Sequence, residues 1–163
     1  PTRGLMGYTS RFLTLTKGTG VINRIFHGYG KFEGEMDGRK NGALISMATG
    51  KAVAFAIFNL QARGEMFVTH NDPVYEGMIV GLTPKPGDMI INVMKGKQLT
   101  NMRTQGTDEN VVLIPVRQMS IAEQLSMLNT DEALEITPKS LRLRKAILNP
   151  HDRKKSEKSG AAA

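Results

Sequence analysis

The chain has 163 residues, of which 40% are hydrophobic and 23% are charged, and this composition is typical of a folded globular protein. No apolar run approaches the ~20 residues that span a bilayer, and the first residues do not form a signal peptide, so we expect a soluble, unexported protein. The sequence contains no cysteine and three widely spaced histidines, which excludes disulfides and thiolate catalysis and disfavours a zinc site.

The net charge of +7 is concentrated at the two ends of the sequence. Residues 1–31 carry +5 and residues 139–163 carry +6, whereas residues 32–138 sum to −4. A neutral or acidic scaffold with basic ends is typical of proteins that bind a polyanion. The alternative is a basic tail that only aids solubility.

The first predicted element is a helix within residues 3–17, which ends before the breaker Gly18-Thr19-Gly20. The β-branched run at 21–26 predicts a strand. A helix and a strand within 31 residues cannot bury a core by themselves, so we expect them to be the second half of a larger domain. Because the chain begins with Pro1 and lacks an initiator methionine, we also expect it to be part of a longer protein.

A glycine-rich linker at 28–42 precedes a series of short apolar segments that are separated by turn signals. These segments predict strands at 43–47, 52–58, 66–70, 74–82, 89–93 and 111–116. Ser120 and Glu123 form a capping box, which predicts a helix whose apolar stripe of Ile121, Leu125 and Leu128 packs on the sheet. The predicted fold class is therefore α+β, with one or two helices packed on a β-rich domain.

The alternation of leucine and arginine at 140–144 predicts a strand that buries its leucines and presents its arginines on the other face. We expect these basic residues to contact RNA, and the candidates are Arg142, Arg144 and Lys145. Asn149 and Pro150 then provide an N-cap and a first-turn proline for a last, basic helix.

Residues 95–110 (KGKQLTNMRTQGTDEN) have few large apolar side chains and cannot contribute much to a core. A long irregular loop of this kind is usually functional, and the alternative is a mobile loop without a ligand. Its basic side chains suit phosphates, and its amides and hydroxyls suit sugars or exposed bases. The candidate residues are Lys95, Lys97, Gln98, Thr100, Asn101, Arg103 and Gln105. Because the loop contains no aromatic residue, recognition of backbone and shape is favoured over base stacking.

No motif for nucleotide hydrolysis is present. The phosphate-binding loop requires GxxxxGK[ST], whereas Gly50-Lys51 is followed by Ala52 and lacks the earlier glycine. A GxSxG nucleophile elbow is also missing. We therefore expect that this chain is not an enzyme and holds no cofactor or metal, and a hydrolase with an unrecognised site is the remaining alternative.

Several long motifs resemble known families. The segments RGLMGY (3–8) and FLTLTKGTG (12–20) resemble the last helix and strand of domain V in translational GTPases related to elongation factor G. Five later motifs occur in order and resemble the C-terminal domain of the BipA/TypA family: GRKNGALIS (38–46), GKAVAFAIFNLQARG (50–64), VYEGMIVG (74–81), NVMKGKQLTNMR (92–103) and TPKSLRLRK (137–145).

The resemblance implies three parts. Residues 1–31 would be the C-terminal half of a ferredoxin-like domain V, residues 32–150 the BipA/TypA-type C-terminal domain, and residues 151–163 a basic tail. The complete protein would be a cytoplasmic, ribosome-associated GTPase that acts in stress response and ribosome assembly, with GTP and Mg²⁺ bound by domains absent from this chain.

The resemblance also implies that the seven loop candidates contact large-subunit rRNA and the acceptor end of an A-site tRNA. No DNA or membrane partner is expected. The alternative from another class is a protein-interaction module that uses exposed β edges and a methionine-rich surface.

Overall fold

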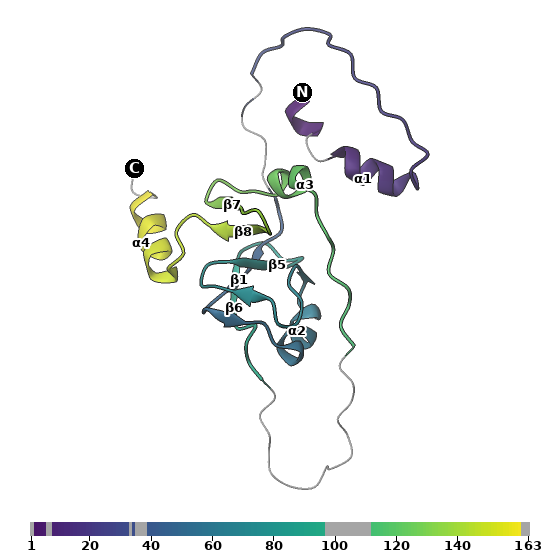
Figure 1. The fold of residues 1–163 in the computed structure, drawn as a ribbon. Coiled ribbons are helices and arrows are strands. Elements are labelled where there is room, and N and C mark those ends of the chain that lie inside the picture. Colours follow the sequence, from purple (N-terminus) through teal and green to yellow (C-terminus); the bar gives the residue numbers. More distant parts are fainter. Residues whose placement is uncertain (1, 6–7, 33, 35–38, 97–111, 161–163) are drawn as a thin grey trace, which may run out of the picture.

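The computed structural model describes residues 2–5, 8–32, 34, 39–96 and 112–160. After a short 3-10 helix at Thr2–Leu5, the helices are α1 (Tyr8–Leu15), α2 (Ala54–Gln61), α3 (Ile121–Ser126) and α4 (Pro150–Gly160). The strands are β1 (Ala43–Ser46), β2 (Gly50–Lys51), β3 (Glu65–Met66), β4 (Pro73–Val74), β5 (Ile79–Leu82), β6 (Met89–Ile91), β7 (Glu132–Ile136) and β8 (Leu141–Lys145) (Figure 1). Mixed helices and sheets of this kind confirm the predicted α+β class.

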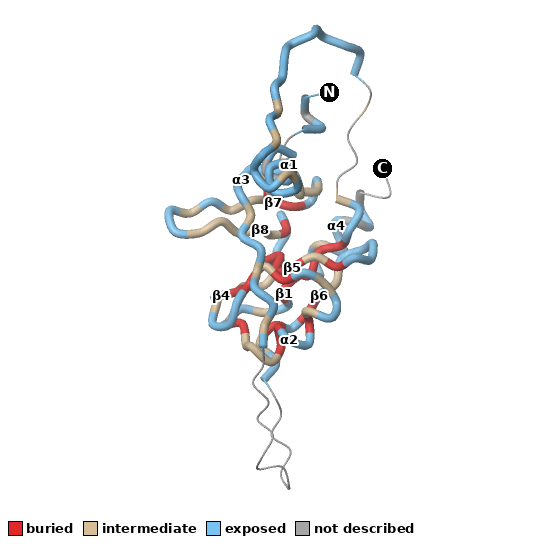
Figure 2. The backbone as a smooth tube through the Cα atoms, turned by 90° about the vertical axis from the view of Figure 1, so that its right-hand side faces the viewer, coloured by how far each residue is buried: buried red, intermediate tan, exposed pale blue. Residues whose placement is uncertain are grey.

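The core lies on the two faces of a four-stranded sheet of order β3-β5-β1-β6, in which β1 is antiparallel to β5 and parallel to β6. Side chains alternate between the faces. Leu44 and Val80 pack with Ile57 of α2, whereas Ile45 and Ile79 pack with Leu143 of β8. Helix α2 and the β7–β8 hairpin therefore cover opposite faces of the sheet (Figures 1 and 2).

The predicted strand at 52–58 is wrong, because most of this segment belongs to α2. A short apolar run does not distinguish a buried strand from a buried helix by its periodicity. The helix buries Ala56, Ile57 and Leu60, which lie on one side of it at helical spacing, against the sheet.

The other predicted strands differ in length from the observed ones. The segments at 43–47 and 89–93 contain β1 and β6. Of the strand predicted at 66–70, only Met66 belongs to a strand, β3. The segment at 74–82 is divided into β4 and β5 by a turn at Gly77, whose positive φ of 83° favours glycine. Residues 112–116, the described part of the predicted strand at 111–116, form no strand.

Helix α3 begins with the predicted capping box, in which Ser120 Oγ accepts from the Glu123 N–H and the Glu123 carboxylate accepts from the Ser120 N–H. The predicted packing of its apolar stripe is largely wrong. Ile121 and Leu125 are 47% and 46% exposed, and only Leu128 packs against the core. The buried residue of the helix is Gln124.

In the N-terminal region, α1 confirms the helix predicted within 3–17, but residues 21–26 do not form the predicted strand. A strand requires a hydrogen-bonding neighbour, and none of the described strands pairs with this segment. Ile25 and Tyr29 are consequently 93% and 99% exposed. Figure 2 shows most of the segment at 21–32 as exposed.

The methionines within the described residues do not form an exposed surface. Met66 and Met78 are buried in the core, and Met89 and Met94 pack against it. Among the described residues only Met47 belongs to the exposed methionines. The methionine-rich surface that the protein-interaction alternative required is therefore not observed in the described residues.

Candidate nucleic-acid interface

The loop predicted to contact RNA lies mostly outside the described residues. Lys95 is described and is exposed. The other candidates in the loop lie within residues 97–111, outside the described residues, and they are Lys97, Gln98, Thr100, Asn101, Arg103 and Gln105. What the structure does define is the place where this segment leaves the domain and the place where it returns.

Both ends of the segment are anchored beside α2. On the outgoing side, Val93 is fully buried and its carbonyl oxygen accepts from the Val53 N–H at 2.9 Å. On the returning side, the Gln61 amide donates to the Ile114 carbonyl at 2.9 Å and accepts from the Ile114 N–H at 3.2 Å. These two hydrogen bonds are arranged like those between paired residues of neighbouring strands. Because both anchors involve residues at the ends of α2, the segment leaves and rejoins the domain at the same edge.

A hollow of about 520 Å³ lies beside this anchor, between α2 and β6. Asn59, Arg63, Asn92 and Lys95 contribute polar groups to its lining, and Arg63 and Lys95 are exposed. Neither cation forms an ion pair with a described carboxylate. Exposed cations beside side-chain amides are suited to phosphate and sugar contacts. Arg63 was not among the candidates predicted from the sequence, because its position beside Lys95 follows from the packing of α2 against β6.

The strand predicted at 140–144 is confirmed as β8, and it pairs with β7 in an antiparallel hairpin that the sequence prediction missed. The register places Glu132 opposite Lys145 and Glu135 opposite Arg142. The missed signal is the match between EALEI (132–136) and LRLRK (141–145), which aligns acids with bases across the two strands.

The two candidate arginines on β8 are half-buried and are engaged within the chain. Arg142 pairs with Glu135 at 3.3 Å, and Arg144 donates to the carbonyl oxygens of Lys145 and Ala146 at 3.2 and 3.4 Å. Glu135 also accepts from the Tyr75 hydroxyl at 2.7 Å, and burial together with this acidic partner raises the pKa of Tyr75 to about 12. A guanidinium has five N–H donors, so these contacts leave donors on both arginines for an RNA phosphate.

The expectation that Lys145 contacts RNA is not supported by its position. The side chain is buried, and its ammonium contacts carboxylates of Asp88, Asp131 and Glu132, the last two at 2.7 and 3.0 Å. An ammonium group has three N–H donors, and three carboxylates occupy them. Lys145 lies on the same side of β8 as Leu143, because alternate residues of a strand share a face. It therefore holds the hairpin to the sheet.

The network around Lys145 extends to Arg39, which makes two contacts with Glu132 at 2.7 and 3.1 Å. Burial alone would lower the pKa of Lys145 and raise that of Asp88. The hydrogen bonds between the three carboxylates and Lys145 outweigh burial and raise the pKa of Lys145. The pKa of Asp88 is lowered by Lys145 and by the Ala43 N–H. The charged forms are thus favoured in the fold.

The structure does not bring all the candidates together. Lys95 lines the hollow beside α2, whereas Arg142 lines a separate cleft at the hairpin, and the two elements lie at opposite ends of the domain (Figure 1). Helix α4 confirms the predicted last helix: Asn149 caps it by accepting from the His151 N–H, and Lys154, Lys155 and Lys158 are exposed along it.

Across the described part of the chain, no group of three or more His, Asp or Glu side chains could hold a metal ion. In the same residues, no helix has the length and apolar character needed to span a membrane.

Comparison with known proteins places this domain in a family. The profile of the TypA/BipA C-terminal domain matches residues 41–150. Proteins named large ribosomal subunit assembly factor BipA are 46% identical to this chain in Salmonella typhimurium (97% of the chain), 47% in Buchnera aphidicola (96%) and 46% in Escherichia coli K12 (98%). The chain spans only 26% of the length of each of these relatives. The chain therefore belongs to the BipA/TypA family, and residues 41–150 correspond to its C-terminal domain.

Proposed function

We propose that this chain is the ribosome-contacting C-terminal module of a BipA/TypA translational GTPase. In this proposal the complete protein acts in the cytoplasm in large-subunit assembly and in stress response, and GTP and Mg²⁺ are bound by its other domains. The relatives' name, large ribosomal subunit assembly factor, supports the ribosome as the partner. The division into a domain V half (1–31), a C-terminal domain (32–150) and a basic tail (151–163) belongs to the same proposal.

The observation that carries the proposal is the anchoring of both ends of the 95–110 segment beside a basic hollow. Gln61 holds the returning end to α2, and Lys95 and Arg63 lie beside the outgoing end without a described carboxylate partner. A polar segment of this length adds little to the core, and long irregular loops of this kind usually carry a function. Its lysines and arginine, together with Arg63, are suited to RNA phosphates.

The proposed RNA-contacting residues comprise two groups. The first contacts large-subunit rRNA and the acceptor end of an A-site tRNA, and consists of Lys95, Lys97, Gln98, Thr100, Asn101, Arg103 and Gln105, to which we add Arg63. The second is the pair Arg142 and Arg144 on the hairpin. Lys145 is omitted because its three donors are occupied by carboxylates.

The test is co-sedimentation of the chain with large ribosomal subunits over a series of salt concentrations. The triple variant K95A/K97A/R103A is compared with K40A/K51A/K85A, which removes the same charge from exposed lysines elsewhere. Each lost phosphate contact flattens the slope of log affinity against log salt by about 0.7 to 0.9, so the loop variant should lose about 2 to 3.

The control variant should keep nearly the slope of the wild-type chain. An equal slope for the loop variant and the wild type would contradict the assignment of these residues. Binding that hardly depends on salt in any variant would favour the protein-interaction alternative, because protein partners do not release condensed counterions.

A further inference from the structure

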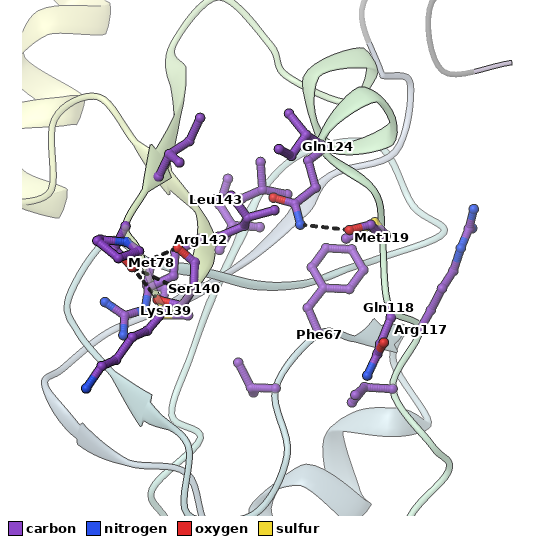
Figure 3. Close-up of a pocket in the computed structure, with 18 residues that line it drawn as sticks. Phe67, Met78, Arg117, Gln118, Met119, Gln124, Lys139, Ser140, Arg142 and Leu143 are labelled. Carbon is purple, nitrogen blue, oxygen red and sulfur yellow. Dashed lines mark hydrogen bonds between the residues drawn. The ribbon is translucent and has the colours of Figure 1, made fainter. Parts of the chain in front are cut away.

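A second cleft lies at the other end of the domain, between the β7–β8 hairpin and the segment that leads into α3 (Figure 3). Its volume is about 700 Å³, which is within the usual range for small-molecule sites of roughly 300 to 1,000 Å³. Phe67, Met78 and Leu143 contribute apolar surface, and Figure 3 shows the Phe67 ring below the Gln124 amide.

The cleft has an unbalanced charge. Its lining contains the cations Arg117, Lys139 and Arg142 and no carboxylate. Arg117 and Arg142 each pair with a glutamate outside the lining, Glu123 at 2.8 Å and Glu135 at 3.3 Å. Lys139 pairs with no carboxylate of the described residues and is exposed at the hairpin turn. An occupant of complementary charge would therefore be an anion.

The cleft also contains a buried acceptor that lacks a donor. Gln124 is 8% exposed, and its Nε2 donates to the Met119 carbonyl oxygen at 3.4 Å. This contact fixes the orientation of the amide, since the reverse orientation would place two acceptor oxygens together. Within the described residues, Gln124 Oε1 has no hydrogen-bond partner. A buried unsatisfied acceptor is costly, and a ligand N–H or O–H would relieve that cost.

Apolar groups at the cleft remain open to solvent. Ile121 is 47% exposed and Ile136 is 63% exposed, and both line the cleft. Of the two exposed residues of the α3 stripe, Ile121 lines this cleft and Leu125 does not. A flat ring with an apolar face and N–H groups at its edge would cover Phe67 and Ile121 and also reach Gln124.

We propose that this cleft binds one unpaired nucleotide of an RNA strand, with its base between Phe67 and Gln124 and its phosphate near Lys139 and Arg142. The cations would also attract an acidic peptide. A nucleobase matches two further features of the cleft, because its flat ring would cover Phe67 and Ile121 and its N–H groups would donate to Gln124 Oε1. The cleft contains Arg142 and is separate from the hollow that contains Lys95, so this inference rests on the proposed function and gives its hairpin group a ligand.

The test measures binding of the 163-residue chain to a short labelled single-stranded RNA by fluorescence anisotropy, beside an abasic strand of the same length and charge. Gln124→Leu keeps the size of the side chain and removes the acceptor. It should weaken RNA binding about three- to tenfold and leave binding of the abasic strand unchanged. Lys139→Gln should weaken binding of both strands, and the control Lys85→Gln should weaken neither.

Thermal unfolding of Gln124→Leu controls for misfolding, and only a small change in stability is expected, because loss of the long 3.4 Å hydrogen bond to the Met119 carbonyl offsets the gain from removing an unpartnered acceptor. The proposal is overturned if Gln124→Leu binds RNA as the wild type does, or if the abasic strand binds as tightly as the RNA. It is also overturned if an acidic peptide of equal charge displaces RNA from the wild type and from Gln124→Leu equally well. Because these readouts use no ribosome and no loop variant, they remain decisive if the proposed ribosome binding fails.

Discussion

Replacement of Lys145 by methionine removes one cation from a buried network while nearly preserving the length of the side chain. In the native structure the Lys145 ammonium contacts Asp88, Asp131 and Glu132. The Glu132 side chain is fully buried, whereas those of Asp88 and Asp131 are 34% and 57% exposed. The variant therefore leaves one buried carboxylate and two that water can still reach.

The expected cost follows from these exposures. Removal of one partner from a buried ion pair typically costs about 3 to 5 kcal/mol. Glu132 keeps its two contacts with Arg39, and water solvates the two aspartates, so we expect the lower limit, about 3 kcal/mol. This is a large part of the roughly 5 to 15 kcal/mol that stabilises a typical domain. It should lower Tm by about 10 °C.

Urea unfolding followed by circular dichroism measures this free energy. Lys85→Met is the matched control, because Lys85 is exposed and pairs with no described carboxylate, and it should change the free energy of unfolding by less than about 0.5 kcal/mol. If Lys145→Met were no less stable than Lys85→Met, the network would not hold the hairpin to the sheet.

Three further predictions follow from the described contacts. The lowered pKa of Asp88 contributes stability that is present above the ordinary pKa of 3.8 and is lost at lower pH. The raised pKa of Lys145 contributes stability that is present below the ordinary pKa of 10.5 and is lost at higher pH. Urea midpoints measured against pH should thus fall outside this window, and Lys145→Met should flatten the profile. Ser120→Ala removes the capping box of α3 and should cost about 1 kcal/mol in the same assay, whereas Ser126→Ala should cost less. Finally, titration of tyrosinate absorbance should show one phenol ionising near pH 12, and Tyr75→Phe should remove that step; a wild-type chain without it would contradict the Tyr75 environment.

Local signals predicted several elements correctly because the deciding interactions lie close together in sequence. The capping box of Ser120 and Glu123 spans a single helical turn, and Asn149 and Pro150 define the start of α4 in the same way. The alternation in β8 likewise gave a strand that buries Leu143, whereas Leu141, which was also predicted to be buried, is half-buried. Such signals require no knowledge of the partner element.

Features that depend on distant partners were not predictable in this way. Whether the run at 52–58 is a helix or a strand depends on the sheet face it covers, and the burial of Lys145 depends on acids at positions 88, 131 and 132. The alternation of the strand places Lys145 on the face of Leu143, so its inward direction could have been predicted, whereas its three carboxylate partners could not. The segment at 21–26 has strand composition but no described strand beside it.

Site-specific photo-crosslinking tests most directly whether the edge of the domain beside α2 contacts large-subunit RNA. A photoreactive amino acid is placed at position 95, or at position 85 as an exposed control, and the chain is irradiated with large ribosomal subunits. The proposal predicts that position 95 crosslinks to ribosomal RNA much more strongly than position 85. Crosslinks from position 95 to ribosomal protein alone, or equal RNA crosslinking from both positions, would contradict it.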